Sequence, residues 1–595
     1  MGAETRQDGM GNVFGVSRSL GGRAWRWRAS ANALSSSDAA DGLVDALLRA
    51  RGVAAEDVAR HRSPTLRDFL PDPAIFNGMK AAAERISDAV QARQKVTIYG
   101  DYDVDGATSA ALLVRLLKEL GLHPDYYIPD RLLEGYGPSG EALVELGKSG
   151  SDLVVTVDCG AMAFDALQQA CDSGVEVIVV DHHKCAAELP PCVALVNPNR
   201  LDEEDEAASY GHLAAVGVAF LLSIEIVRTL RNREFFAGRR EPNLLELLDL
   251  VALGTVADVA ALHGLNRAFV AQGLKVMARR DNIGIAALID ASRLKRAPVC
   301  SDLGFALGPR INAGGRVGES TLGVRLLTTA CPDEARGIAE TLSHLNEDRR
   351  AIEAAVQEAA EAMVETQHNR AVLVAAGEGW HPGVIGIVAG RIKEKYGRPA
   401  IVIALDGDEG KGSGRSIVGV DLGAAIIAAR GEGLLKAGGG HAMAAGLTVE
   451  KNMVEQLSDW LEARLERDVA RASASLITVL DLSVAPSGLT PDLVKLLEQA
   501  GPYGVGWPGP RLAVGPVRLV KADVVGQGHV RIIASGQDGA SFKGIGFRMA
   551  DSELGQALLH GARDRRLWLA GRAKIDDWGN RPAAELHLED AAFAD

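Results

Sequence analysis

The sequence predicts an α/β protein whose first large domain is built on a mostly parallel sheet. Between residues 95 and about 200, apolar runs suited to buried strands alternate with stretches of helical periodicity. This alternation is typical of βαβ units, in which helices cover both faces of a parallel sheet. At 595 residues the chain is too long for one hydrophobic core, so we expect two to four domains.

The elements of this first domain follow from periodicity and from turn signals. Residues 1–40 are rich in Gly, Ser and Ala and read as an N-terminal arm, and residues 41–92 have helical periodicity. Strands are expected at 96–99, near 125–128, and at 153–157, 176–180 and 193–196. The intervening helices are expected at 107–120, 139–148 and 162–172.

The pattern changes several times further along the chain. Residues 212–230 and 243–262 read as apolar helices, and residues 333–366 form a long helical stretch rich in Ala and Glu. A helix of that length after an α/β domain often bridges to the next domain, and a second α/β unit is expected from Ala371 to about residue 467. From about residue 474, short β-like runs predict a small barrel, for which the OB type is one candidate. These runs are 512–520, 529–534, 542–548 and 566–573.

Composition limits the class of protein without deciding it. The net charge of −14 counts against a nucleic-acid binder, although local patches decide binding and bound metal offsets acidic charge. None of the six cysteines has the C-x-x-C spacing of a zinc or dithiol motif. There is no run of about 18 apolar residues and no apolar signal core, so we expect a cytoplasmic protein without a membrane span. The segment 23–28, with three Arg and two Trp, is either a basic patch or part of a docked or disordered arm.

Acidic and histidine residues recur where buried strands are predicted to end. The first cluster follows strand 96–99, the second follows 153–157, the third follows 176–180, and the fourth ends the apolar run 252–257. The clusters are Asp101, Asp103 and Asp105; Asp158; Asp181, His182 and His183; and Asp258. The fourth is also taken as a strand end, although the stretch 243–262 around it reads as helical. Polar residues at the carboxyl ends of neighbouring parallel strands converge on one crevice.

A crowd of carboxylates in one crevice repels itself unless cations are present, which favours a site for divalent metal ions. The string Asp101, Asp103, Asp105, Gly106 also resembles the start of a calcium EF-hand loop. That interpretation is rejected, because the twelfth position holds Leu112 rather than Glu and a strand precedes the loop. A solvent-exposed acidic turn is the remaining alternative, and the recurrence at three other positions argues against it.

The histidine pair adds a second kind of chemistry. A lone His is more often a satisfied core residue than a ligand, but two adjacent His after an Asp at a strand end are much less common. One imidazole would bind metal, and the other would donate to a phosphate or to the leaving oxygen. The single carboxylate of Asp158 is placed to bridge two ions.

Three later segments combine Gly with Arg or His and suit phosphate binding. Glycine lets backbone N–H groups approach an oxyanion, and Arg holds phosphate through a bidentate fork. The segments are 308–316 with Arg310 and Arg316, 412–416 with Ser413 and Arg415, and 438–441 with His441. For each alone, a tight turn with a surface side chain is at least as good an interpretation. Arg131, just beyond a strand, is another phosphate candidate, although by itself it reads better as a solvated Arg.

These residues together resemble the DHH phosphoesterase superfamily. Asp103 and Asp105 match its first motif, Asp158 its second, Asp181 to His183 its third and Asp258 its fourth, and 438–441 resembles the signature of the DHHA1 domain. Within the superfamily the chain resembles most the RecJ family, which are bacterial 5′→3′ exonucleases specific for single-stranded DNA. That resemblance rests on segments 100–106, 308–313, 380–389 and 440–446, and it covers about residues 13 to 595.

The resemblance implies a domain order and an architecture. The fold is α/β, with a parallel-sheet DHH domain joined by a long helix to a smaller α/β DHHA1 domain, followed by an OB-like β-barrel. The expected boundaries are 1–40 for the arm, 41–325 for DHH, 326–368 for the linker helix, 369–468 for DHHA1 and 469–595 for the barrel. Two segments depart from the family pattern, at 314–315 and at 503–508, and the second puts the detail of the barrel in doubt.

The resemblance also implies roles for individual residues. The metal ligands would be Asp103, Asp105, Asp158, His182 and Asp258, with Asp158 bridging and Asp101 either a ligand or next to one. His183 would contact the scissile phosphate, and Arg310 would steady the transition state. Ser413 and Arg415, with Arg131, would bind the 5′ end, His441 would contact backbone phosphate, and Arg316 is a looser candidate for a further phosphate contact.

The expected activity is hydrolysis of single-stranded DNA to 5′-mononucleotides with two Mn²⁺ or Mg²⁺ ions, in DNA repair and recombination. The imidazole ligand tips the choice of metal toward Mn²⁺. Phe542, Phe547 and Trp568 are candidates for base stacking, and we expect two of the three to pack in the core instead. The alternatives are a phosphodiesterase for short oligonucleotides or cyclic dinucleotides, a pyrophosphatase, and a non-catalytic DNA-binding scaffold. The resemblance further implies a single-strand-binding protein and a helicase as partners, and we expect a monomer.

Overall fold

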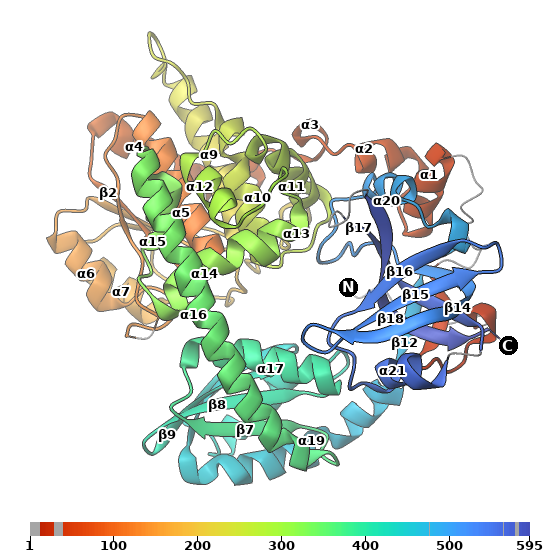
Figure 1. Cartoon of the computed structure of the whole chain (residues 1–595). Coiled ribbons are helices and arrows are strands. Elements are labelled where there is room, and N and C mark those ends of the chain that lie inside the picture. Colours follow the sequence, from red (N-terminus) through yellow and green to blue (C-terminus); the bar gives the residue numbers. More distant parts are fainter. Residues whose placement is uncertain are drawn as a thin grey trace. The chain divides into compact units, whose positions relative to one another are not determined.

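The computed structural model describes residues 12–28, 40–131, 133–474, 476–562, 565–576 and 582–594. The chain divides into two compact units. The first, called the catalytic unit below, comprises Pro64–Ala470 with Gly504–Gly506. The second, called the barrel unit, comprises Met1–Ser63, Arg471–Tyr503 and Trp507–Asp595. Figure 1 shows the labelled elements of both units.

A five-stranded parallel sheet forms the centre of the first half of the catalytic unit, as the sequence predicts. Its order is β3 (Asp125–Tyr127), β2 (Val96–Gly100), β4 (Leu153–Val157), β5 (Val177–Val180) and β6 (Ala194–Val196). Strands β2, β4, β5 and β6 are buried along their whole length. Helices cover both faces of such a sheet, which explains why these strands are continuous apolar runs rather than alternating ones.

The register of this sheet brings three strand ends level with one another. Gly100 pairs with Val157, and Val157 pairs with Val180. The next residue on each strand is an aspartate, namely Asp101, Asp158 and Asp181. The three carboxylates therefore begin at the same edge of the sheet.

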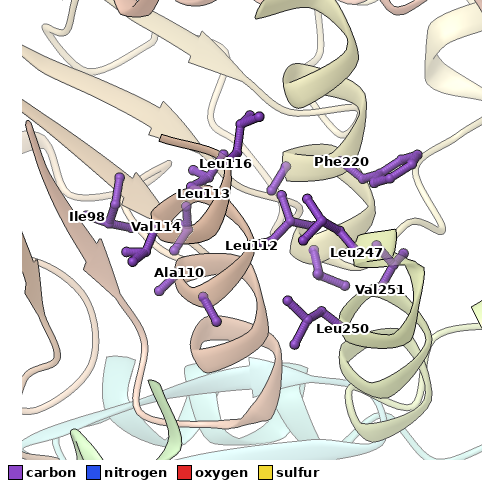
Figure 2. Packing of buried hydrophobic residues seen from close by; sticks show 14 of the residues in the cluster. Ile98, Ala110, Leu112, Leu113, Val114, Leu116, Phe220, Leu247, Leu250 and Val251 are labelled. Atoms are coloured by element: carbon purple, nitrogen blue, oxygen red, sulfur yellow. The ribbon is translucent and has the colours of Figure 1, made fainter. Parts of the chain in front are cut away.

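Helices pack against the sheet and against one another. They include α4 (Met79–Ala92), α5 (Val104–Glu119), α6 (Gly140–Lys148), α7 (Phe164–Asp172), α8 (Asp205–Ala208), α9 (Ala215–Asn232), α10 (Leu248–Ala257) and α11 (Gly264–Met277). Further along are α12 (Ile283–Ala291), α13 (Cys300–Asp302), α14 (Gly308–Val317) and α15 (Leu322–Thr328), and before the sheet is α3 (Leu66–Phe69). The core lies between these helices and the sheet, and Figure 2 shows Leu112 of α5 and Leu250 of α10 within it.

One expectation about this half of the unit is wrong. Asp258 follows helix α10 rather than a strand, and its backbone is the C-terminal cap of that helix. The apolar run before it is buried on most sides, and a fully buried helix has no polar face to reveal its period. The helical interpretation of 243–262 is confirmed.

A single long helix, α16 (Pro332–Val364), leads to the second half of the catalytic unit, as predicted. It packs against α12, α14 and α15 and then against α17 (Pro382–Tyr396). The second sheet has the order β10 (Ala437–His441), β11 (Ala444–Glu450), β9 (Glu409–Arg415), β8 (Ala400–Asp406), β7 (Leu373–Glu378). Helices α18 (Leu422–Gly431) and α19 (Val454–Ala474) complete this α/β half.

The barrel unit contains the closed β-barrel expected after residue 474. Its strands run β14 (Leu512–Val525), β15 (His529–Gly536), β16 (Ser541–Gly546), β18 (Ala583–Phe593) and β17 (Leu567–Asp576), and β14 pairs with β17 to close the ring. Strand β13 (Leu482–Val484) pairs with β14. Four of these strands were expected, and β18 was not. Helices α1 (Ala40–Ala50), α2 (Val58–Arg62), α20 (Pro491–Glu498) and α21 (Glu553–Gln556) belong to the same unit.

The described part of the predicted N-terminal arm is docked on the barrel unit. Strand β1 (Ala24–Trp27) pairs in parallel with β12 (Ile477–Leu480). The Trp25 side chain is fully buried, and its Nε1 donates to Asp590 Oδ2 at 2.8 Å. Most of the segment 23–28 is thus a strand of this unit, and residues 1–11 and 29–39 of the expected arm lie outside the described residues. Among the described helices, none is both long enough and apolar enough to span a bilayer.

Candidate metal centre

The acidic and histidine clusters meet at the edge of the first sheet where strands β2, β4 and β5 end in register. Three overlapping groups have ligand atoms that all lie within 4.8 Å of one another. The groups are Asp158 with His182 and His183, Asp105 with His182 and Asp258, and Asp101 with Asp103 and Asp158. All six residues that the sequence predicts as metal ligands are therefore brought together, and His183 lies with them.

Backbone groups fix the orientation of two of these carboxylates. Asp103 is the N-cap of α5, and its Oδ1 accepts from the N–H groups of Asp105 at 2.9 Å and Gly106 at 3.2 Å. Asp105 is buried, and its two oxygens accept from the N–H groups of Ala215 and Val216 at the start of α9. Helix N-termini favour negative charge, so both helices stabilise the acidic cluster.

The chain turns sharply after β4 to present Asp158. This residue has a φ of 61°, which is uncommon for a residue other than glycine, and Gly160 follows with a φ of 111°. Such strained backbone persists where the surrounding structure over-determines it and is frequent in functional sites.

Three buried polar atoms of the cluster have no hydrogen-bond partner. They are Asp101 Oδ1, Asp158 Oδ1 and His182 Nε2. His182 Nδ1 lies 3.0 Å from the Leu213 carbonyl oxygen and so carries the proton, which leaves a lone pair on Nε2. That lone pair lies 3.2 Å from Asp158 Oδ1. Two buried acceptors facing one another are costly unless a cation lies between them, so the donor set fits a bound metal ion.

The pKa shifts within the cluster also indicate a site for cations. Burial and the nearby Asp103 carboxylate raise the pKa of Asp101 to about 8 and that of Asp258 to about 7. Burial also raises the pKa of Asp105 and Asp158 well above the usual range. Burial and the neighbouring His183 lower the pKa of His182 to about 4, so this imidazole is neutral near pH 7. Bound cations reverse this penalty on the carboxylates, and a neutral imidazole is the form that binds metal.

His183 is held differently from His182. Its Nδ1 lies 2.8 Å from Asp181 Oδ1, and Asp181 also accepts from the Ala161 N–H at 2.9 Å. Burial acts to lower the pKa of His183, but the hydrogen bond and charge of Asp181 outweigh burial and raise it. Asp181 therefore orients His183, whose side chain remains 42% exposed toward the solvent.

Tyr136 is a neighbour of this site that the sequence analysis missed. Its hydroxyl donates to the Asp158 carbonyl oxygen at 3.1 Å and lies 3.1 Å from His183 Nδ1. Gly135 and Gly137 flank it with φ values of 87° and 83°. The only signal in the sequence is this Gly-Tyr-Gly triplet, which marks a turn but does not say what the turn approaches.

Four of the predicted phosphate-binding residues line one cleft in the catalytic unit. This cleft, called the arginine cleft below, has a volume of about 580 Å³. It is lined by Arg131, Arg316, Ser413 and Arg415, and also by Lys411, which the sequence analysis did not single out. The residues come from both halves of the unit, so neither sequence segment reveals the cleft by itself.

The arginines of this cleft are held in place. Arg316 donates from Nη1 to the Gly383 carbonyl oxygen at 2.8 Å, and Arg415 donates from Nη1 to Ser413 Oγ at 3.1 Å. The guanidinium of Arg131 lies over the Tyr102 ring, 4.8 Å from its centre. Burial and the nearby Arg131 lower the pKa of Arg316 to about 10. Cations that crowd one another in this way favour an anionic ligand.

The last two predicted residues lie elsewhere. His441, at the end of β10, lines a second cleft together with His183. Arg310 on α14 donates to Ser343 Oγ at 3.0 Å and to the Ala306 carbonyl oxygen at 2.7 Å. Within the residues that the structure describes, no hydrogen bond or ion pair joins Arg310 to the acidic cluster, and its role stays a prediction.

Comparison with known proteins identifies the family. The model of the DHH family N-terminal domain matches residues 95–255, the DHHA1 domain matches 369–467, and the RecJ OB domain matches 480–590. The single-stranded-DNA-specific exonuclease RecJ of Dickeya dadantii is 37% identical over 547 residues, which cover 88% of this chain and 92% of that protein. The chain belongs to the RecJ family. The RecJ of Escherichia coli is also 37% identical, over 85% of this chain and 89% of its own length.

Solved RecJ structures have the same architecture. RecJ from Thermus thermophilus in complex with Mn²⁺ matches with a TM-score of 0.75 at 30% identity, covering 92% of this chain and 76% of that one. The complex with Mg²⁺ matches with a TM-score of 0.67 at 28% identity. The predicted fold class, with DHH, DHHA1 and OB domains, is confirmed.

Proposed function

We propose that this member of the RecJ family is a metal-dependent exonuclease that degrades single-stranded DNA from its 5′ end to 5′-mononucleotides, in DNA repair and recombination. The observation that carries the proposal is the set of unpaired buried donor atoms on Asp101, Asp158 and His182. The relatives named as single-stranded-DNA-specific exonucleases support the substrate.

The acidic cluster would hold two divalent ions, Mn²⁺ or Mg²⁺. One would bind among Asp101, Asp103 and Asp158, the other among Asp105, His182 and Asp258, with Asp158 bridging. Bound there, two ions would supply Lewis acidity for hydrolysis of a phosphodiester. The imidazole in the donor set favours Mn²⁺, and the two solved RecJ complexes from Thermus thermophilus contain Mn²⁺ and Mg²⁺.

The remaining residues would bind and orient the strand. His183, held by Asp181, would donate a hydrogen bond to the scissile phosphate. Arg131, Arg316, Ser413 and Arg415 would hold the 5′-terminal phosphate in the arginine cleft, because charged donors in a partly buried site bind phosphate strongly. His441 would contact the backbone, and Arg310 would reach the transition state only after leaving its present partners.

Of the three aromatic candidates on the barrel, Phe547 is the best placed to stack on a base. Phe542 is buried, whereas Phe547 is 53% exposed and packs edge-on against His529 and His587. Trp568 is covered by Phe14, whose ring is parallel to it at 3.9 Å. Base stacking of this kind tolerates any sequence, as an exonuclease requires.

We also propose a single-strand-binding protein and a helicase as partners, a monomeric state and a cytoplasmic location. The partners rest on the family resemblance, and the monomeric state and the location are carried over from the sequence analysis.

The test is a time course on a single-stranded oligonucleotide with a 5′ phosphate and a 3′ label, in Mn²⁺. We expect a ladder that shortens from the 5′ end, that EDTA abolishes and that a matching blunt duplex does not give. Asp158→Ala should reduce the rate by roughly 100-fold or more, because loss of a metal ligand costs more than the loss of a residue that only orients one. Asp172→Ala, the same change at an exposed position on α7, is the matched control and should match the unsubstituted chain. Cleavage of dinucleotides only would overturn the proposal.

A further inference from the structure

A second cleft, called the His183 cleft below, lies directly beside the metal centre. Its volume is about 620 Å³, within the range of sites that bind small organic groups. Its lining includes His183 and Asp181 from the metal centre and His441 from the second half of the unit. Its walls are largely apolar and contain Tyr136, Pro138, Met162 and Phe164. None of the roles assigned above uses these walls.

Two of the apolar side chains in these walls are unusually open to solvent. Met162 is 57% exposed and Tyr136 is 56% exposed, although both lie next to a charged centre. Large apolar surface left open in a cleft marks a ligand site more often than a packing defect. Methionine is flexible and polarisable and makes favourable contacts with aromatic rings, so Met162 suits a flat ligand of variable shape.

Hydrogen bonds hold Tyr136 in its place in the cleft wall before any ligand binds. Gly137, the next residue, accepts a hydrogen bond on its carbonyl oxygen from the Tyr99 hydroxyl at 3.2 Å. The Tyr136 hydroxyl is itself bonded to the Asp158 carbonyl oxygen, so its ring is held against the metal centre. A site formed before the ligand arrives binds it with less loss of conformational entropy.

We propose that the His183 cleft receives the nucleobase of a nucleotide that flanks the scissile phosphate, through apolar contact with Met162 and Tyr136. This inference rests on the proposed function, which places the scissile phosphate at His183. A base attached to that phosphate through its sugar is the part of the substrate that must lie nearby. Apolar walls hold any of the four bases, so the cleft would give affinity and position without sequence preference.

The experiment combines removal of one base from the substrate with removal of one side chain from the enzyme, so that the two losses can be compared. Labelled oligonucleotides carry a tetrahydrofuran abasic residue at the first, second or eighth position from a 5′ phosphate. They are degraded in Mn²⁺ by the unsubstituted chain, by Met162→Ala and by Met363→Ala. Met363 is 41% exposed on α16 and lines neither cleft, so it is the matched control.

We expect the unsubstituted chain and Met363→Ala to start on the oligonucleotide roughly tenfold more slowly when the abasic residue is at the first or second position, and at the full rate when it is at the eighth. Met162→Ala should be slowed by up to roughly tenfold on the intact strand, and the abasic residue should then slow it further by clearly less than in the unsubstituted chain, because only Tyr136 still contacts the base. Equal rates on intact and abasic strands would overturn the inference, as would equal slowing of both by Met162→Ala. If the intact strand is not degraded at all, the proposed function itself fails.

Discussion

At the residue scale, the site depends on which atoms are left without partners. The sequence indicates which acidic residues belong to the metal centre, because each cluster of them follows an apolar run. It does not indicate that His182 turns Nε2 inward, because that orientation depends on a hydrogen bond to the Leu213 carbonyl oxygen in a distant segment. Tyr136 was missed for a similar reason, since its contact with His183 joins two loops. Tertiary contacts of this kind have no local signature.

The raised pKa values of the cluster predict how stability varies with pH. The folded-state pKa of Asp101, about 8, and that of Asp258, about 7, lie above the usual value near 4 for an unfolded aspartate. The folded protein therefore binds more protons than the unfolded chain between these limits, and its stability falls as pH rises. His183 acts in the same direction. The lowered pKa of His182 acts in the opposite direction, mainly up to about pH 6.5 and only weakly above it.

We accordingly expect the melting temperature of the protein in EDTA to fall between pH 6.5 and pH 8.5. In Mn²⁺ the fall should be absent or reversed, because bound cations favour the charged carboxylates. Differential scanning calorimetry at both pH values, with and without metal, measures this. A melting temperature in EDTA that rises over the same interval would contradict the account of the cluster.

At the element scale, the strands of the first sheet follow from their composition, and the level strand ends follow from their register. Two elements show the limits of that reasoning. The apolar run before Asp258 suits a buried strand and a buried helix equally, and only the fold decides. Strand β18 contains several Ala and Glu residues, which are uncommon in strands, so its composition does not indicate a strand.

The packing of α10 against α5 supports the metal centre, because Asp103 caps the N-terminus of α5 and Asp258 caps the C-terminus of α10. Leu250 of α10 is fully buried there. We expect Leu250→Ala to reduce the free energy of unfolding by about 2–5 kcal/mol. Leu201→Ala, at a side chain that is 71% exposed, should change it by less than about 0.5 kcal/mol. Urea denaturation followed by far-UV circular dichroism measures both, and equal losses would contradict the packing described here.

At the scale of the whole molecule, segments from near the two ends of the sequence pack together in one unit. Strand β1 near the N-terminus joins β12, and the buried Asp590 accepts hydrogen bonds from Trp25 and from Ser19. No periodicity reveals such a pairing between the two ends of a sequence. The order of the DHH, DHHA1 and OB domains was predictable from motifs, whereas the proposed boundaries between them remain a prediction.

The central claim is that the acidic cluster is a metal centre, and metal content tests it most directly. The protein and its Asp158→Asn variant would be dialysed against Mn²⁺, freed of excess ion and analysed by inductively coupled plasma mass spectrometry. We expect about two ions per chain for the unsubstituted protein and clearly fewer for the variant, because Asp158 contributes to more than one group of ligand atoms. No bound Mn²⁺, or equal amounts in both proteins, would contradict the claim.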